Sequence, residues 1–407
     1  MSAIAYEAPR TRRFAALTDS LWVVGRAGVV FGRHWPVLFT LALTGVAAHD
    51  LILLGAVKAA LVNSTLGLLV LLLAPVATMI SLVLMLRSVR VSLPHLRAAA
   101  ALETDGRSRR LSLLECVGSI AVPYLAIYEA YGTMRDEFSQ FAYEVWRNDP
   151  ISTLDHLPFS PTAGVISVVV VAVALRFVLG KLTDRSAFGW LSPLGAYLEV
   201  VWVATVAWTV SLLRGNFDGW FGQRQVSVWW HQALDMLPGH QLGALLESWF
   251  ATLWENVDLV ILAPVAWLTM GAVVFGRNIE EPKLTDERIL TATARRVSSL
   301  PVIRMFSGPV NTELNKRFGP LLGSLRMFAK AGLRPMLLFC LVFVLLEWAT
   351  TGLWELERII IGPQDLQKVW WGLSYLLSPI NTTVRFVVLV CLLGAATDRI
   401  LQSREAS

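Results

Sequence analysis

The chain has 407 residues, of which 55% are hydrophobic and only 16% are charged, and its formal net charge is +5. Soluble domains carry about 25% charged residues, so this composition excludes disordered, fibrous and small disulfide-rich proteins and argues against an ordinary soluble enzyme. The class that remains consistent with this composition is that of polytopic membrane proteins. The three cysteines, Cys116, Cys340 and Cys391, lie in apolar segments without a CxxC pair, so neither a disulfide framework nor a zinc site is expected.

Apolar segments of about 18–25 residues recur along the chain, and a helix of that length crosses about 30 Å of hydrocarbon. Each is expected to be a helix, because the segments do not alternate as barrel strands do and because lipid tolerates no unpaired backbone. The predicted fold class is all-α: a polytopic membrane protein with about eight transmembrane helices and additional interfacial amphipathic helices. The predicted spans are 36–57, 66–87, 113–132, 161–179, 190–213, 256–276, 336–354 and 379–398.

Basic residues predict the orientation. With the N-terminus in the cytoplasm, 27 of the 35 Arg and Lys residues fall in the inner segments, as the positive-inside rule requires. Both termini are therefore expected to be cytoplasmic. The basic segments would face an anionic leaflet, so the net charge needs no nucleic-acid partner. The excess of Arg over Lys, with much Ala, Val and Gly, is typical of GC-rich bacterial genomes and favours a bacterial inner (plasma) membrane.

Four parts follow in chain order. Residues 1–35 form a cytoplasmic amphipathic segment without the apolar core of a removable signal peptide. Residues 36–276 hold the first six spans, with a Trp-rich outer-face insertion at 214–255. That insertion is too polar to span, yet it has an apolar helical stripe, so it is predicted to lie on the surface, with a re-entrant hairpin as the alternative. Residues 277–334 form a basic cytoplasmic loop with amphipathic helices, and 335–407 hold the last two spans and a short cytoplasmic tail.

Carboxylates occur in all four predicted ascending spans, at Asp50, Glu129, Glu199 and Glu347. A charge at the bilayer centre costs about 2.5–3.5 kcal/mol on insertion scales, so it needs a partner or a wet cavity. One interpretation is a polar pathway that binds a cation or relays protons; the other places Asp50 and Glu129 near the outer headgroups. Glu199 and Glu347 lie deeper and are expected to be buried and paired. Arg385 is the natural partner of Glu347, because the last two spans form a hairpin.

Two further groups of polar side chains lie in the predicted spans. His49 precedes Asp50, but adjacent helical residues point about 100° apart, so the two are not expected to face each other. Tyr124, Tyr128 and Tyr131 recur at helical spacing, which is more typical of packing or of an interfacial belt than of a ligand site. No catalytic residue, metal ligand set or cofactor is predicted.

Tryptophan is frequent, and ten of the sixteen lie on or beside the predicted outer face. An aromatic belt explains only part of this, because a belt is expected on both sides of the membrane. The bias indicates amphipathic structure that either docks a lipid, a lipid-linked substrate or a partner protein, or simply rests on the bilayer. The residues predicted to form this interface are Trp229, Trp230, Trp249, Trp254, Trp370 and Trp371.

Three functions remain open. Transport of a small solute or a lipid-type substrate is favoured by the deep carboxylates, by Arg385, and by Val-Trp-Trp fragments at 228–230 and 369–371 that hint at an internal duplication. A non-catalytic membrane partner or scaffold subunit is favoured by the Trp-rich surface and the long basic loop. A lipid-linked transferase is a weaker hypothesis, based on Asp136 and Glu137 in the loop after the third span. No HExxH, GxSxG or Walker motif is present, so an enzyme is not favoured.

Overall fold

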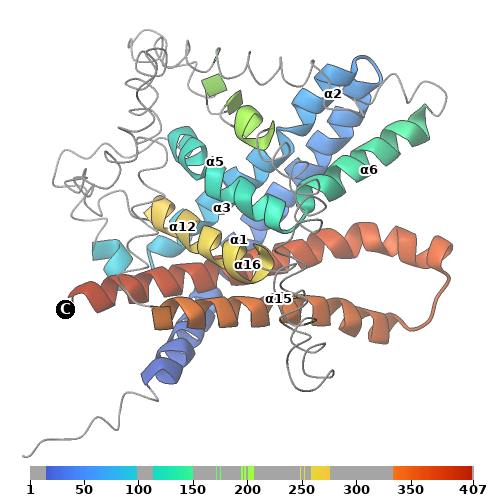
Figure 1. The fold of residues 1–407 in the computed structure, drawn as a ribbon. Coiled ribbons are helices and arrows are strands. Elements are labelled where there is room, and N and C mark those ends of the chain that lie inside the picture. The colour runs from blue at the N-terminus through green and yellow to red at the C-terminus, as the bar shows by residue number, and fades with distance from the viewer. Residues whose placement is uncertain are drawn as a thin grey trace, which may run out of the picture. The chain divides into compact units, whose positions relative to one another are not determined.

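The computed structural model describes residues 15–98, 113–149, 258–275 and 333–405, with a few further positions between 171 and 252. The regular elements in these ranges are all helices, as predicted (Figure 1). The chain divides into two compact units. Unit 1 comprises Met1–Leu43, Leu82–Arg110 and Leu268–Ser407, and unit 2 comprises Thr44–Ser81 and Leu111–Trp267.

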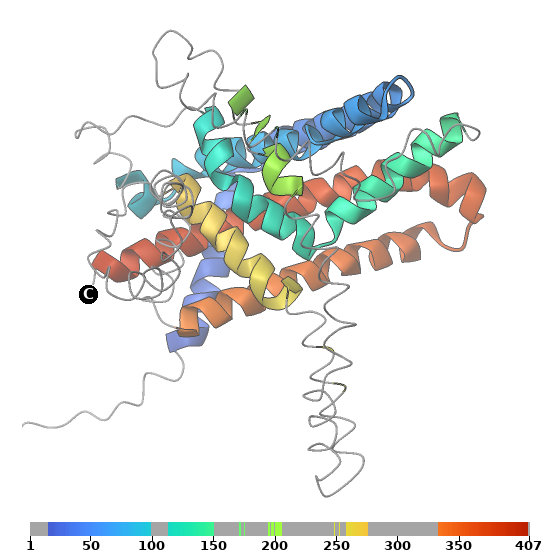
Figure 2. The same ribbon diagram turned by 45° about the horizontal axis from the view of Figure 1, so that its top comes forward.

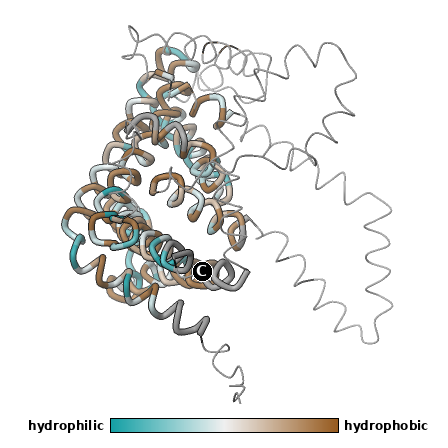
Figure 3. Tube along the Cα trace, turned by 90° about the vertical axis from the view of Figure 1, so that its left-hand side faces the viewer, coloured by the Kyte–Doolittle hydropathy of each residue, from teal (hydrophilic) through white to brown (hydrophobic). Residues whose placement is uncertain are grey.

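Among the residues that the structure describes, four helical segments are long and apolar enough to cross a membrane, and apolar residues run along much of their length (Figure 3). They overlap four of the predicted spans and are Trp22–Ala60, Ser64–Arg90, Phe339–Ile361 and Leu366–Arg399. Two shorter apolar helices lie within the predicted third and sixth spans, at Ile120–Ala130 and Ala263–Phe275. The remaining predictions fall mainly outside the described residues: the spans 161–179 and 190–213, the insertion 214–255 and the loop 277–334.

Helix α1 (Ala15–Ala60) is a single helix of 46 residues, about 69 Å long at 1.5 Å per residue. The sequence predicts an amphipathic helix that gives way at Pro36 to a span, whereas α1 continues through Pro36. A proline removes one backbone hydrogen bond, which is a small part of the total in a helix of this length. The hydroxyl of Thr40 donates a 2.8 Å hydrogen bond to the Pro36 carbonyl.

In unit 2, α1 turns back tightly into α2 (Ser64–Leu71). The side chain of Asn63 caps α2 by accepting hydrogen bonds from the N–H groups of Thr65 at 2.9 Å and Leu66 at 3.2 Å. Gly67 lies so close to α1 that an added Cβ would come within 2.5–2.9 Å of Ala60 atoms. The absence of a side chain at Gly67 therefore allows the two helices to pack this closely.

The polar segment after the predicted third span is a helix and not a loop. Helix α5 (Leu113–Ala130) ends at a turn in which Gly132 has φ +66°, and α6 (Thr133–Asn148) follows. The apolar face of α6 packs on the end of α1 and on α2, and this burial stabilises the helix. The buried residues of this core are Leu53, Ala56, Val57, Ala60, Leu71, Phe141 and Val145.

The predicted span 66–87 is interrupted between α2 and α3 (Ala74–Arg90). Pro75 supplies no N–H, and the Leu73 N–H donates to the Val70 carbonyl at 3.0 Å, three residues back and not four. The carbonyl of Leu69 is thereby released from its usual helical partner. The hydroxyl of Tyr197 donates a hydrogen bond to it. Tyr197 and Leu72 both pack against the buried residues Leu198 and Val201.

In unit 1, α15 (Leu333–Ile361) and α16 (Trp371–Glu405) form an antiparallel hairpin (Figures 1 and 2). The connection contains Gly362 with φ +75° and a short π-helical turn, η3 (Leu366–Trp370), capped by the Asp365 side chain. The C-terminal half of α16 is buried against α3 and α12 (Ala263–Phe275), which follows η2 (Asp258–Leu262). An added Cβ at Gly394 would lie 2.9 Å from Val89, and one at Gly271 would lie 2.9 Å from Leu393.

Candidate functional site

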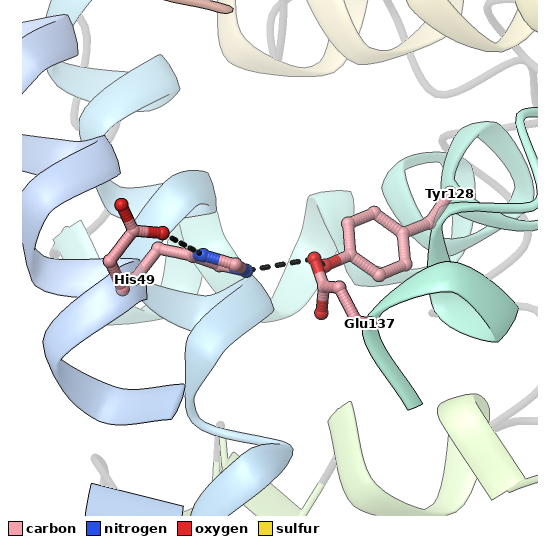
Figure 4. A network of polar contacts seen from close by, with 4 residues as sticks. His49, Tyr128 and Glu137 are labelled. Carbon is pink, nitrogen blue, oxygen red and sulfur yellow. Dashed lines mark hydrogen bonds and ion pairs between the residues drawn. The ribbon is translucent and has the colours of Figure 1, made fainter. Parts of the chain in front are cut away.

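A polar network in unit 2 joins three helices: α1 through His49, α5 through Tyr128 and α6 through Glu137 (Figure 4). The Nε2 atom of His49 lies 2.8 Å from Oε1 of Glu137, and the Tyr128 hydroxyl donates a hydrogen bond to the same oxygen. The other ring nitrogen, Nδ1, lies 3.3 Å from Oδ1 of Asp50. One histidine is therefore flanked by two carboxylates, and one carboxylate oxygen holds two donors.

Helical spacing explains why these side chains meet. His49 lies four residues before Leu53, and Glu137 lies four residues before Phe141. Residues four apart share a face of a helix, and Leu53 and Phe141 belong to one apolar core. The contact between His49 and Glu137 is thus the next layer of the interface that already joins α1 to α6. On α5, Tyr128 packs against Tyr124, with ring centroids 5.5 Å apart.

Burial distinguishes the members of the network. The side chains of His49 and Glu137 are 16% and 14% exposed, whereas that of Asp50 is 55% exposed. An ionised carboxylate only accepts hydrogen bonds, so a ring with a carboxylate oxygen beside each nitrogen matches the imidazolium form, in which both nitrogens donate. The arrangement can therefore hold a proton on His49 and exchange it with Glu137, with the Tyr128 hydroxyl bonded to the receiving oxygen.

Two sequence-based expectations about this region are wrong. Asp136 and Glu137 were expected in a solvated loop, but they lie near the start of the α6 helix, where Asp136 is exposed and Glu137 is half-buried. His49 and Asp50 were not expected to face each other, yet their side chains are 3.3 Å apart, because side-chain rotation closes the angle between adjacent positions. The spacing of Glu137, Phe141 and Val145 is the signal that could have identified an inward-facing carboxylate.

A second polar contact lies in unit 1, inside the α15–α16 hairpin. Arg385 places Nε 3.1 Å and Nη2 3.0 Å from Oε1 of Glu347, so the predicted pairing is confirmed. One step toward the tip of the hairpin, the buried Asn381 donates a 3.1 Å hydrogen bond to Glu357. The interface between α15 and α16 therefore contains two polar contacts, although both helices are apolar overall.

The other predicted site residues have mixed outcomes. Glu129 is half-buried, and the structure places no described cation against its side chain. Trp370 is half-buried and Trp371 is exposed, both at the tip of the hairpin. The remaining predicted residues lie outside the described ranges, so their convergence with the others stays a prediction: Glu199, Trp229, Trp230, Trp249 and Trp254.

Sequence reasoning missed a buried carboxylate at the end of the last predicted span. Asp398 of α16 is fully buried, and its Oδ1 accepts backbone hydrogen bonds from His95 at 3.0 Å and Leu96 at 3.1 Å. These are N–H groups at the start of the helical residues 94–98, which have no partner within their own helix. Asp398, which caps this helix, lies 302 residues after Leu96, so no local sequence pattern predicts the contact.

In the parts of the chain that the structure describes, no group of three His, Cys, Asp or Glu side chains is placed to hold a metal ion. Cys116, Cys340 and Cys391 are all buried and unbridged. Comparison with protein-family models, with curated proteins and with solved structures finds no match for this chain.

Proposed function

We propose that this protein is a multi-pass membrane transporter of a small solute or a lipid-type substrate, and that the network of His49, Tyr128 and Glu137 binds the proton that couples to transport. The observation that carries the proposal is the shielded His49–Glu137 pair, with Tyr128 on the same oxygen. Ionisable groups among membrane helices are expensive to keep, and chains of Asp, Glu and His mark proton relays in pumps and transporters.

The network also offers a way for a proton to act on structure. A single oxygen of Glu137 accepts from α1 and from α5, so it links three helices. When Glu137 takes up a proton it loses its charge, and hydrogen bonds to a neutral acceptor are weaker than those to a carboxylate. Protonation at this oxygen therefore loosens α6 from both α1 and α5 at once, which is the type of bistable contact that alternating access needs.

The test is proton movement in proteoliposomes that contain an internal pH-sensitive dye, with the membrane potential set by potassium and valinomycin. A panel of solutes and short-chain lipids is added outside, and acidification is recorded for the wild type, for His49→Gln and for Glu137→Gln. We expect substrate-dependent flux in the wild type and its loss in both variants, because neither replacement can carry the proton.

Asp136→Asn is the matched control, since it removes an acid from the adjacent exposed position of the same helix. It is expected to keep the wild-type flux. Flux that survives in Glu137→Gln would refute the assignment of the network. The transferase hypothesis makes a different prediction: Asp136→Asn combined with Glu137→Gln should abolish transferase activity without loss of expression.

We further propose eight spans, a bacterial inner membrane and cytoplasmic termini. The charge bias supports this orientation. Two contacts within unit 1 also support it, because Arg26 bonds to Ser92 and Arg399 lies over Trp22, and these residues come from three segments predicted to be inner. Single cysteines introduced at Arg33 and Val62, in a cysteine-free background, test this with a membrane-impermeant maleimide on right-side-out cells. Labelling is expected only at position 62, and labelling at 33 would reverse the orientation.

A scaffold subunit is the second candidate, and one observation favours it. The outer half of the α15–α16 hairpin presents large apolar side chains, including Trp348 at 79% exposure, on surfaces that no described helix covers. Extraction of the native protein into lipid nanodiscs distinguishes the two candidates. A stoichiometric partner membrane protein, together with no flux for any solute, would favour the scaffold over the transporter.

A further inference from the structure

Three segments meet in unit 1 around Ser92, in the turn that follows α3. The guanidinium of Arg26, on α1, donates from Nη2 to the Ser92 carbonyl at 3.4 Å, and His34, two turns further along α1, bonds to the Ser92 hydroxyl. The end of α16 reaches the same region, with the guanidinium of Arg399 5.1 Å from the centre of the Trp22 ring. We call this the Ser92 junction.

The charge of the Ser92 junction is strongly one-sided. The segments that meet there, 22–34, 87–97 and 398–399, contain six arginines and two histidines but one acid, Asp398. That acid is fully buried, and its Oδ1 is bound to the backbone N–H groups of His95 and Leu96. Within these three segments positive charge is therefore in excess, which favours an anionic ligand.

Arg26 is held in a position suited to an anionic ligand. Its Nε is buried with no acceptor, and among the described residues the long bond to the Ser92 carbonyl is the one hydrogen bond of its five N–H groups. The side chain as a whole stays half-exposed. A planar guanidinium presents paired donors that match the oxygens of a phosphate. The contact with Ser92 thus orients the Arg26 guanidinium, whose other N–H groups can donate to a ligand.

The surroundings of Arg26 favour a lipid as the source of that phosphate. On α1, Trp22, Phe31 and Trp35 are exposed on either side of Arg26 in sequence, together with Val24. Aromatic side chains beside basic residues are typical of the headgroup level of a bilayer. The candidate span Trp22–Ala60 begins here, so a lipid bound by its headgroup can lay its chains along the apolar surface of the same helix.

We propose that the Ser92 junction binds the phosphodiester headgroup of an anionic phospholipid, with Arg26 as its principal contact. The site is independent of the proposed transport activity and of the network around His49. Bound lipid bridges α1 to the turn after α3 and so adds to the contacts that already join these segments.

The test uses full-length protein in mild detergent, with phosphatidylglycerol, phosphatidylcholine of identical chains, and inorganic phosphate added in separate arms. Native mass spectrometry counts bound lipid, and thermal unfolding reports the stabilisation. We expect phosphatidylglycerol to bind and stabilise, with phosphatidylcholine and inorganic phosphate having little effect. Arg26→Gln should weaken phosphatidylglycerol binding about fivefold, which is the effect of about one basic group at an anionic surface, and Arg26→Lys should lie between the two.

Arg358→Gln is the matched control, because Arg358 is an exposed arginine of the same unit that pairs with Glu355 at 3.2 Å. It should bind lipid as the wild type does. Equal binding of the two lipids, or equal losses in Arg26→Gln and Arg358→Gln, would overturn the proposal. A shift of the same size with inorganic phosphate would overturn the lipid as the ligand. If Arg26→Gln does not fold, the wild-type arms alone decide.

Discussion

Arg385 reaches across the α15–α16 hairpin and places two of its nitrogens, at 3.0 and 3.1 Å, on one oxygen of Glu347. The two side chains are 26% and 18% exposed, so much of the pair is shielded from its surroundings. This contact fixes which residue of one helix lies opposite which residue of the other.

Replacing either partner should destabilise the hairpin. Arg385→Gln removes the ion-pair partner of Glu347, and Glu347→Gln removes that of Arg385, so each should lower the free energy of unfolding by about 2 kcal/mol. The double variant should recover part of that loss, because no unpaired charge remains. Thermal unfolding in detergent measures all three. Arg358→Gln should change stability by at most about 0.5 kcal/mol, because its pair with Glu355 is largely exposed, and additive losses in the double variant would contradict the coupling.

The close approach of α1 and α2 predicts a large effect from one methyl group. In Gly67→Ala, the new Cβ would meet Ala60 side-chain and backbone atoms at 2.5–2.9 Å, so the helices must separate at a cost of about 1–3 kcal/mol. Gly55→Ala is the control, since an added Cβ there meets nothing within 4 Å, and alanine favours a helix. We expect a lower melting temperature for the first variant and an unchanged or higher one for the second. Equal melting temperatures would show that the hairpin can open without loss.

The hydroxyl of Tyr197 should matter more than that of an exposed tyrosine. Tyr197→Phe removes the donor from the Leu69 carbonyl and leaves a partly buried acceptor unsatisfied, which costs about 1 kcal/mol. Tyr143→Phe removes a hydroxyl from an exposed ring on α6 and should be neutral. Chemical unfolding of both variants checks this, and no difference between them would mean that water or lipid satisfies the carbonyl equally well.

Asp398 should control a segment that is distant from it in sequence. Asp398→Ala removes the acceptor of the His95 and Leu96 amides and should cost about 1–2 kcal/mol, the range for a lost helix cap. Asp398→Asn keeps an oxygen acceptor and should cost less. Hydrogen exchange localises the effect: in Asp398→Ala the amides of 94–98 should exchange faster, while those of α6 should not. Uniformly faster exchange in both segments would point to global destabilisation.

The sequence predicts the features of this protein that the lipid environment restricts most strongly. Long apolar runs that do not alternate predict helices, because such a run can pair its own backbone in lipid only as a helix, and four of them appear as expected in the described residues. The pairing of Arg385 with Glu347 was also accessible, because a hairpin brings neighbouring spans together and the spans offer few cations. In both cases the environment leaves the chain few alternatives.

Prediction from the sequence fails for contacts that depend on how the helices pack against one another. Glu137 looks like a solvated acid until α6 is seen to lie on α1, and Asp398 looks like the polar end of a span until its distant backbone partners are known. The continuity of α1 through Pro36 was missed for a related reason: a proline marks a helix end only when the flanking residues do not support the helix on both sides.

The break between α2 and α3 has a mechanical consequence. Within a regular helix, bending requires several backbone hydrogen bonds to stretch together, but at Leu72–Leu73 the regular bonding is already interrupted and the Leu69 carbonyl is held by the hydroxyl of Tyr197. Releasing that one side-chain bond lets the two helical pieces change their angle while each keeps its own backbone bonds. The hydrogen bond from Tyr197 therefore helps to hold the angle between α2 and α3 within this candidate span.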